Sequence, residues 1–384
     1  MKIMLLTNIL TPFRIYFYDQ LYSHMKNRNI EFKVFVMTAT EPGRTWEYSK
    51  FKREYTELLS GKLYEFSGIH IIINPQIKKK IMNFNPDIAI CAGSYMLFSV
   101  WTALKLRNKL NYKTFLWSES HLEEKRDYGK VKLKFRDFMR LKIIKNFDGF
   151  WYAGKMSKEF LRVYGKKDAK YVFVPNLVEE AAYESAQYLS KERVTEIKSR
   201  YNISEEKIVL LCPARLSKVK GIPQFLNLFK DCKSKNKCTI LIPGIGELED
   251  EIRRLAKQNK IDLRLLGFKS QEELIELYAA TDIFLLPSLS DPNPLSCIEA
   301  AWAGKPMIVS KHVGNHPELI IEGENGCVID YINFEESIIS IDGLLNKDKK
   351  WLKRAGQISY NIAKEQYNSE LVIDRIIDET ISII

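Results

Sequence analysis

Two acidic residues eight positions apart form the clearest chemical pattern in this chain. Asp291 and Glu299 are the two ends of the segment Asp291-Pro-Asn-Pro-Leu-Ser-Cys-Ile-Glu299, which follows the apolar run 283–286. The apolar run predicts a short buried strand, and residues 295–303 predict a helix. In an open parallel sheet, ligands bind at the carboxyl ends of strands, and the first N–H groups of a helix attract anions. The pattern therefore indicates a site for a polyhydroxylated, negatively charged ligand.

Further motifs stand in a fixed order around this segment. They are Pro213-Ala-Arg215-Leu-Ser-Lys-Val-Lys220-Gly221, Pro243-Gly244-Ile-Gly246-Glu247, Leu266-Gly267-Phe268, Gly304-Lys-Pro306 and Gly314-Asn-His-Pro-Glu318. Together with the two carboxylates, they resemble the retaining nucleotide-sugar glycosyltransferases of family 4, the glycosyl transferases group 1. The resemblance implies the GT-B fold, in which two Rossmann-like domains face a cleft.

The resemblance implies four catalytic residues. Arg215 and Lys220 match the pair that grips the donor diphosphate, where arginine offers a fork of donors and lysine a point charge. Glu299 matches the carboxylate that accepts hydrogen bonds from the ribose. Asp291 stands where the family often has a longer glutamate, which contacts the transferred sugar. Such cations would stabilise the charge that develops on the leaving nucleoside diphosphate, without a metal.

Two more loops belong to the implied donor site. Gly244 and Gly246 follow a predicted strand, where small residues let a backbone approach a ligand or turn tightly. A plain strand-to-helix turn explains these glycines equally well. Phe268 and Lys269 stand where the family reads the nucleobase, largely through the main chain.

The loop between the two carboxylates departs from the family pattern. Pro292 and Pro294 replace positions that often hold glycine, and proline has no N–H group. The backbone donors left for the sugar or the phosphates are therefore those of Asn293, Leu295 and Ser296.

The acceptor residues are expected in the first half of the chain. Arg14 ends a loop that lacks the glycine pair common in the family, and Gly93 follows the strand predicted at 88–91. Glu119 and His121 follow the strand predicted at 114–118. In the family a histidine after the equivalent strand often faces the reacting centre, and either Glu119 or His121 would fill that place.

Alternating strands and helices must position these residues. Runs rich in β-branched and aromatic residues predict strands at 2–7, 31–37, 88–91, 114–118, 149–153, 171–174, 208–212, 239–242, 263–266, 283–286, 306–309 and 326–329. Helix-like segments between them indicate an α/β protein with two doubly wound parallel sheets. We expect an acceptor domain at 1–182 and a donor domain at 183–365, with the polar segment 179–206 as the best candidate for a connector. The resemblance implies that the last helix, 366–384, crosses back to the first domain.

Composition limits the class of protein. The chain has 384 residues, 46% apolar and 28% charged, enough for two cores. Its apolar runs are shorter than the roughly 20 residues that a spanning helix needs. No signal-peptide pattern follows Met1, so we expect a cytoplasmic location. The six cysteines form no C-x-x-C pair and favour reduced packing residues. With no Asp-x-Asp triplet and no zinc-like histidine spacing on a helix, we expect neither a metal nor another cofactor.

The formal net charge of +11 predicts an anionic partner. Basic residues concentrate at 78–80, 125–145 and 166–170. Within 130–145, one helical face gathers apolar residues and the opposite face arginines, namely Val131, Phe135, Phe138 and Met139 against Arg136 and Arg140. This segment is either a helix packed on its own sheet with a solvated basic back, or a surface for an anionic membrane. No nucleic-acid motif accompanies the charge.

The motifs predict a retaining glycosyltransferase that moves a hexose or N-acetylhexosamine from a nucleotide-diphosphate sugar to a lipid-linked or polysaccharide glycan. Two alternatives stay open. One is a non-catalytic donor-binding or scaffold subunit of a membrane glycan-assembly complex, which the prolines at 292 and 294 and the missing glycine pair favour. The other is a GT-B-like nucleotide-sugar epimerase, for which the chain has few catalytic carboxylates and histidines. Residue types do not encode the sugar, the acceptor or the linkage.

Overall fold

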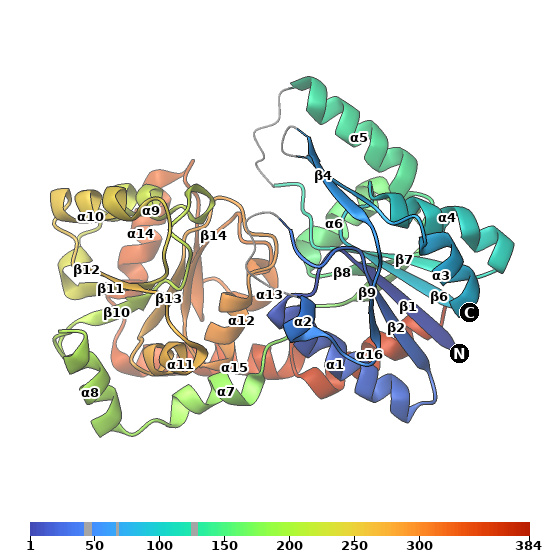
Figure 1. The fold of residues 1–384 in the computed structure, drawn as a ribbon. Coiled ribbons are helices and arrows are strands. Elements are labelled where there is room, and N and C mark those ends of the chain that lie inside the picture. The colour runs from blue at the N-terminus through green and yellow to red at the C-terminus, as the bar shows by residue number, and fades with distance from the viewer. Residues whose placement is uncertain (42–47, 67–68, 124–129) are drawn as a thin grey trace. The chain divides into compact units, whose positions relative to one another are not determined.

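The computed structural model describes residues 1–41, 48–66, 69–123 and 130–384, which fold into two compact units (Figure 1). The first unit contains residues 1–122, 130–176 and 369–384, and the second contains Leu177–Asn368. The chain therefore enters the second unit after Asn176 and returns to the first at Ser369. Each unit is built on its own parallel sheet.

Seven parallel strands form the sheet of the first unit, in the order β3-β2-β1-β6-β7-β8-β9. They are β1 (Lys2–Thr7), β2 (Glu31–Val36), β3 (Thr56–Leu58), β6 (Ile88–Ala92), β7 (Lys113–Ser118), β8 (Gly149–Tyr152) and β9 (Lys170–Phe173). The strand order reverses between β1 and β6. Ligands bind at such a switch point, outside the carboxyl ends of the strands.

Helices cover both faces of this sheet because successive side chains of a strand point to opposite faces. Leu116 and Phe150 enter the core beneath one helical layer. That layer consists of α3 (Ile77–Phe84), α4 (Phe98–Leu110), α5 (Lys130–Ile144) and α6 (Lys155–Tyr164). The next residues, Trp117 and Trp151, face the other way: Trp117 packs on Phe17, and Trp151 Nε1 donates to Thr380 Oγ1 at 2.9 Å.

The opposite layer joins the two ends of the chain. It consists of α1 (Pro12–Asn27) and the last helix, α16 (Ser369–Ile381), which lie side by side in Figure 1. His24 Nδ1 lies 2.9 Å from Asp374 Oδ1, and Arg28 Nη2 donates to the same oxygen at 2.8 Å. The C-terminal helix is therefore part of the first unit.

Two smaller elements complete the first unit. α2 (Tyr48–Phe51) is one turn, and β4 (Lys62–Phe66) pairs with β5 (Ile69–Ile73) as an antiparallel ribbon. Ile72 of the ribbon enters the core beneath α3 and α4.

Six parallel strands form the sheet of the second unit, in the order β12-β11-β10-β13-β14-β15. They are β10 (Ile208–Leu211), β11 (Cys238–Pro243), β12 (Leu263–Gly267), β13 (Ile283–Leu286), β14 (Met307–Ser310) and β15 (Gly326–Ile329). β11, β13 and β14 are buried along their whole length, as strands covered on both faces are. The order reverses between β10 and β13, which is the switch point of this unit.

The helices of the second unit begin with α7 (Glu180–Glu184), η1 (Ser185–Tyr188) and α8 (Lys191–Arg200). They continue with η2 (Lys218–Lys220), α9 (Ile222–Phe229), η3 (Lys235–Lys237), α10 (Glu249–Gln258), α11 (Gln271–Ala279), α12 (Leu295–Trp302), α13 (His316–Leu319), α14 (Phe334–Leu345) and α15 (Lys349–Gln366). They surround one apolar core centred on the strands.

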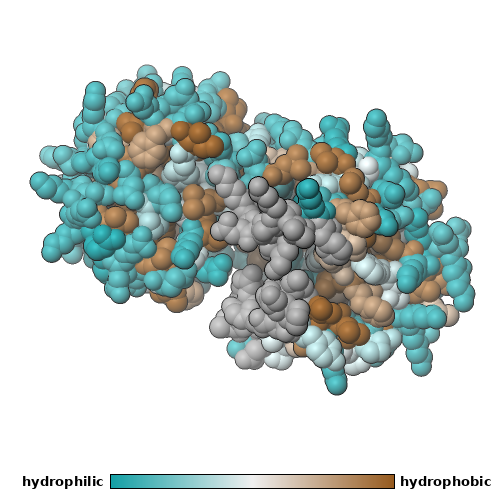
Figure 2. All heavy atoms as spheres, turned by 90° about the horizontal axis from the view of Figure 1, so that it is seen from above, coloured by the Kyte–Doolittle hydropathy of each residue, from teal (hydrophilic) through white to brown (hydrophobic). Residues whose placement is uncertain are grey.

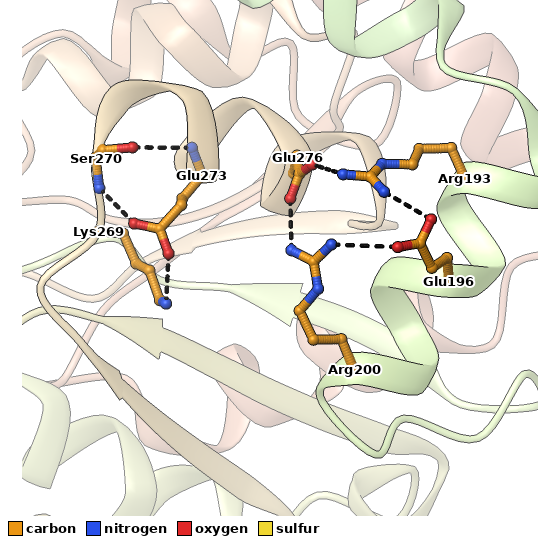
Figure 3. Close-up of polar contacts among 7 residues, drawn as sticks. All are labelled: Arg193, Glu196, Arg200, Lys269, Ser270, Glu273 and Glu276. Carbon is orange, nitrogen blue, oxygen red and sulfur yellow. Dashed lines mark hydrogen bonds and ion pairs between the residues drawn. The ribbon is translucent and has the colours of Figure 1, made fainter.

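An ion-pair network fastens α8 to α11 (Figure 3). Arg193 and Arg200 of α8 both donate to the carboxylate of Glu276, the second at 2.7 Å, and Glu196 accepts from Arg193 at 2.6 Å. Burial opposes ionisation of Glu276, yet the two arginines keep its pKa below the ordinary value. The polar segment after Leu177 is thus held on the second unit.

The predicted fold class is confirmed: both units are α/β with parallel, doubly wound sheets. Each of the twelve predicted strands is present within one residue of its expected ends. Strand β3 was not predicted, since three residues are too few for a period-two pattern. The ribbon β4–β5 was not predicted either. Among the described residues, no helix has both the length and the apolar character to cross a bilayer.

The predicted facing of α5 is correct for Met139, which packs against the core, but wrong for Arg140 and Phe138. Arg140, placed on the solvated side, is buried, and its Nε donates to Tyr95 Oη at 3.2 Å. Its guanidinium lies over the ring of Phe160, 4.8 Å from the centroid, because that part of the core offers aromatic faces. Phe138 is instead exposed. The side chains of Val131 and Phe135 lie outside the described part of the structure.

Candidate functional site

The loops after β10 and β11 lie against each other at the carboxyl edge of the second sheet. The N–H group of Ala214 donates to the carbonyl of Pro243 at 3.2 Å. A Cβ at Gly244 would clash with the carbonyl oxygen of Ala214, and one at Gly246 would clash with that of Leu216. Both glycines are therefore needed for this close approach of two backbones.

The loop after β13 is fastened on both sides. The N–H group of Leu289 donates to Val219 O, in the loop after β10, at 2.8 Å. On the other side, the N–H group of Gly314 donates to Asp291 O at 2.8 Å, from the loop after β14. Because these bonds set the backbone before any ligand arrives, a ligand at this edge meets a preorganised surface.

The fit between the β13 and β14 loops predicts a glycine requirement. A Cβ at Gly314 would clash with the carbonyl oxygen of Pro292. We expect Gly314→Ala to lower the free energy of unfolding by about 1–3 kcal/mol, measured by urea denaturation. Gly343 of α14 is the control, because a Cβ there meets no atom within 4 Å. Gly343→Ala should stabilise the protein by about 0.5–1 kcal/mol. Equal effects of the two substitutions would contradict the close fit.

Lys220 and Asp291 form an ion pair at the switch point between β10 and β13. Lys220 Nζ lies 2.5 Å from Asp291 Oδ2, and the two side chains are only 19% and 14% exposed. The Ser288 hydroxyl donates to the same carboxylate oxygen at 3.4 Å. Arg215, in the same loop as Lys220, is exposed and forms no ion pair with any residue that the structure describes. A cation and a carboxylate are thus held together, and the loop that carries Lys220 also carries Arg215.

Glu299 is held by two tyrosines. It lies on α12, where the hydroxyl of Tyr278 donates to its Oε2 at 3.0 Å and to the Ser296 carbonyl at 3.2 Å. The hydroxyl of Tyr183, on α7, also lowers the pKa of this carboxyl group. Burial raises the pKa of Glu299, and the two tyrosine hydroxyls partly offset that rise. Neither tyrosine was predicted from the sequence, since each lies on a different helix and belongs to no local motif.

One buried thiol lies within electrostatic reach of three of the predicted residues. Burial raises the pKa of Cys297 most; Asp291 and Glu299 raise it further, and Lys220 lowers it. All three charged groups therefore act on one thiol near the start of α12. Cys297 itself is packing, as predicted for the cysteines: all six are buried and free.

The segment after β13 also contains Asn293, Leu295 and Ser296, whose backbone N–H groups are the predicted donors to the ligand. Asn293 is buried, Leu295 packs against the core, and the carbonyl of Ser296 accepts from Tyr278. The side chain of Asn315 donates to the Pro294 carbonyl at 2.9 Å, which fixes the start of α12.

Phe268 and Lys269 lie after β12 at the same edge. Phe268 is largely exposed. Lys269 Nζ lies 2.8 Å from Glu273 Oε1, and this bond raises the pKa of Lys269 (Figure 3). Glu273 also accepts from the Ser270 N–H group, and Ser270 Oγ accepts from that of Glu273. The lysine thus belongs to the capping arrangement of α11.

In the first unit, Arg14 and Glu119 come together at the carboxyl edge. Arg14 Nη2 donates to Glu119 Oε1, although the two residues stand 105 positions apart. The guanidinium lies over the ring of Trp117, 3.9 Å from the centroid. Gly93 lies against Asn8, whose side chain would meet any Cβ at that position. His121 is buried. The predicted acceptor residues thus follow β1, β6 and β7, around the switch point of this sheet.

Comparisons with known proteins show which family and fold the chain resembles. Residues 193–364 match the family model of the glycosyl transferases group 1. N-acetyl-alpha-D-glucosaminyl L-malate synthase of Bacillus anthracis is 27% identical over 209 residues, 54% of this chain and 52% of that protein. Alpha-monoglucosyldiacylglycerol synthase of Streptococcus pneumoniae is 26% identical over 181 residues, 46% of this chain and 40% of that protein. The chain thus spans about half the length of the curated relatives that it matches.

The fold also matches solved structures. The Anabaena protein HepE in complex with UDP aligns with a TM-score of 0.75 at 15% identity, over 100% of both chains. At such low sequence identity, the match supports a shared fold and no more. The family model covers the unit that holds the Lys220–Asp291 pair and Glu299. Through residues 193–364, this chain is therefore similar to the glycosyl transferases group 1 family, and its fold is GT-B.

Proposed function

We propose that the chain is a retaining, family 4 glycosyltransferase that moves a hexose or N-acetylhexosamine from a nucleotide-diphosphate sugar to a glycan acceptor. The observation that supports this most is the Lys220–Asp291 ion pair at the switch point of the unit that matches the glycosyl transferases group 1, with Arg215 on the same loop as Lys220 and Glu299 on the following helix.

Each of these residues suits one part of such a donor. Lys220 and Arg215 would hold the diphosphate, and the free N–H groups at the start of α12 would add hydrogen bonds to it. Glu299, steadied by Tyr278, would accept from the ribose hydroxyls. Asp291 would contact the hydroxyls of the sugar. Because side-chain cations offset the charge of the leaving diphosphate, the proposed reaction uses neither a metal nor another cofactor.

Retention is proposed from the family resemblance. In front-face displacement, the leaving phosphate takes the proton of the acceptor hydroxyl as the new glycosidic bond forms. The carboxylates and the two cations hold the donor meanwhile, so no dedicated side-chain base is needed. Excluding water from the reacting groups would limit hydrolysis.

The acceptor would bind at the first unit, near Arg14, Gly93, Glu119 and His121. The Arg14–Glu119 pair leaves polar groups at that edge, which suits a hydroxylated ligand. We propose a lipid-linked or polysaccharide glycan, met in the cytoplasm at the membrane face. One relative that supports a lipid-linked acceptor is named for a glucosyldiacylglycerol.

Donor binding is testable by thermal shift with UDP-, GDP- and ADP-sugars. A donor that binds the folded state alone, at 100 times its Kd, should stabilise by about 2.7 kcal/mol and raise Tm by about 5–10 °C. Donors of one nucleotide class should give the largest thermal shift, because a single part of the site contacts the base. No shift with any of these donors at saturating concentration would contradict the proposal.

A transfer assay separates the enzyme from a donor-binding subunit. Incubation of the chain with the stabilising donor and a membrane extract should release the nucleoside diphosphate and label a glycan. A thermal shift without release of diphosphate would favour the non-catalytic subunit. Conversion of the donor sugar itself, with no acceptor present, would favour the epimerase.

A further inference from the structure

The outward face of α5 carries apolar and basic side chains together. Phe138 and Leu141 are 51% and 50% exposed, and they lie one helical turn apart. Lys134, Lys142 and Lys145 are exposed on the same side, and Lys142 Nζ lies 4.5 Å from the ring centroid of Phe138. The one acidic residue of this helix, Asp137, is turned toward Arg140 and Tyr164.

This helix has large apolar side chains on its outer side as well as its inner side. A surface helix usually turns its apolar stripe to the core and its charges to water. Here the inward side holds the Arg140 guanidinium, bonded to Tyr95 and Asp137, beside the buried Ile143 and Ile144, while Phe138 and Leu141 face outward. Packing within the first unit does not explain that choice, because the described part of the unit leaves Phe138 and Leu141 half-exposed.

Helix α4 of the same unit also exposes apolar and basic side chains. Phe98 and Trp101 of α4 are exposed, and Lys105 follows one turn later on the same side. Tyr95 joins the two helices: its carbonyl accepts from Trp101 Nε1 at 2.9 Å, and its hydroxyl accepts from Arg140. Both α4 and α5 therefore contact Tyr95.

The ribbon β4–β5 extends the surface beyond α4. Tyr64 and Ile71 are cross-strand partners and both are exposed, as is Ile73, whereas Ile72 between them enters the core. β5 contacts α4. Figure 2 shows brown hydrophobic side chains among teal ones on the first unit. We call the exposed side chains of the ribbon, α4 and α5 the apolar-basic surface.

Charge around this surface is almost all positive. Helices α3, α4 and α5 contain three, three and six lysines and arginines, against a single acidic residue, Asp137. Lys78, Lys105 and Lys134 have no ion pair with any residue that the structure describes. A partner must therefore combine an apolar interior with a negatively charged rim.

We propose that the apolar-basic surface of the first unit docks on an anionic phospholipid bilayer. Phe, Leu and Ile side chains would enter the acyl boundary, Trp and Tyr would lie at the headgroups, and lysines would extend to lipid phosphates. Positive charge without acidic neighbours favours a bilayer over a protein, whose interface core is depleted of charge.

The surface begins beside the acceptor edge of the same unit. The short loop between β6 and α4 contains Gly93 and Tyr95, and α4 begins at Phe98. The start of α4 therefore lies next to the loop assigned to the acceptor. If the proposed function holds, docking would bring the head of a lipid-linked acceptor to that edge. The docking itself does not depend on transfer and is measured without it.

Vesicle sedimentation of the full chain tests the proposal. The chain should bind vesicles of phosphatidylcholine mixed with phosphatidylglycerol and should bind phosphatidylcholine alone far less. Phe138→Ser with Leu141→Ser should lower the partition coefficient about a hundredfold, or about tenfold for each side chain withdrawn from the bilayer. Lys134, Lys142 and Lys145 changed together to Glu should lower it at least about a hundredfold.

Matched controls come from the second unit. Ile339→Ser removes an exposed apolar side chain of α14, and Lys349, Lys350 and Lys353 changed to Glu alter the same charge on α15. Neither control should change vesicle binding. All variants should keep the melting temperature of the wild type, because every altered side chain is exposed.

Three results would overturn the proposal. One is equal binding to both kinds of vesicle, and another is wild-type binding by the folded α5 variants. The third is retention by heparin or RNA, or self-association, without vesicle binding. Donor thermal shift on the same protein keeps the two proposals separate. If vesicle binding is absent and the donor thermal shift is present, only the membrane-docking proposal is wrong. If vesicle binding is present and no donor gives a thermal shift, only the transferase proposal is wrong.

Discussion

Arg215→Ala should lower kcat for sugar transfer about 100- to 1,000-fold, as removal of one preorganised charge-stabilising donor does in other enzymes. The ligand-free protein should keep its melting temperature, because Arg215 is exposed and has no ion pair among the described residues. KM for the donor should change less than kcat if the guanidinium acts mainly on the leaving diphosphate. Steady-state kinetics and calorimetry measure the two effects.

Lys220→Ala should lower kcat to a similar extent but also destabilise the protein. The substitution leaves Asp291 without the cation that lies 2.5 Å away in a largely buried position. Lys218, exposed on the same short turn, is the matched control, and Lys218→Ala should change neither quantity. If Lys218→Ala and Lys220→Ala reduced kcat alike, general positive charge would explain the effect and the assigned site would be wrong.

Glu299→Gln should weaken donor affinity about ten- to a hundredfold, because an ionised acceptor of the ribose hydroxyls becomes a neutral amide. The same variant should be at least as stable as the wild type. Burial raises the pKa of Glu299 above the ordinary 4.5, so ionising this group costs free energy in the folded state.

The stability difference between Glu299→Gln and the wild type should depend on pH. For a carboxyl whose folded pKa is raised, its contribution to stability is present below the unfolded-state pKa and is lost as pH rises through the folded value. The variant cannot ionise there, so its melting temperature should gain on that of the wild type between pH 4.5 and neutrality. Donor titration by calorimetry checks the affinity. Unchanged affinity in a folded Glu299→Gln protein would remove the ribose assignment.

Tertiary structure changed the interpretation of α5 most. Periodicity placed Phe138 inward and Arg140 outward, because a pattern of apolar residues assumes an apolar core beneath the helix. The structure puts Tyr95, Phe160 and Tyr164 beneath it, and a guanidinium can stack on such rings. No property of residues 130–145 alone reports what lies under them.

In the candidate site, too, the sequence predicts some features and only the fold shows the others. The order of the motifs placed Lys220 and Asp291 in loops at one sheet edge, but the two stand 71 positions apart and only the fold shows that they pair. Tyr278 and Tyr183 have no motif, and their hold on Glu299 follows from the packing of α7, α11 and α12. Side-chain contacts between distant segments depend on every element that separates them.

By itself, the sequence determined what is local: the twelve predicted strands, the alternation that makes both units α/β, and the ordered loop motifs that indicate the family. These follow from apolar runs and turn residues, which act over a few positions. Only the tertiary structure decided the carboxylate partners, the pairing of Arg14 with Glu119 and the outward turn of Phe138. Those features depend on which surfaces meet, and a contact between distant residues leaves no period in the chain.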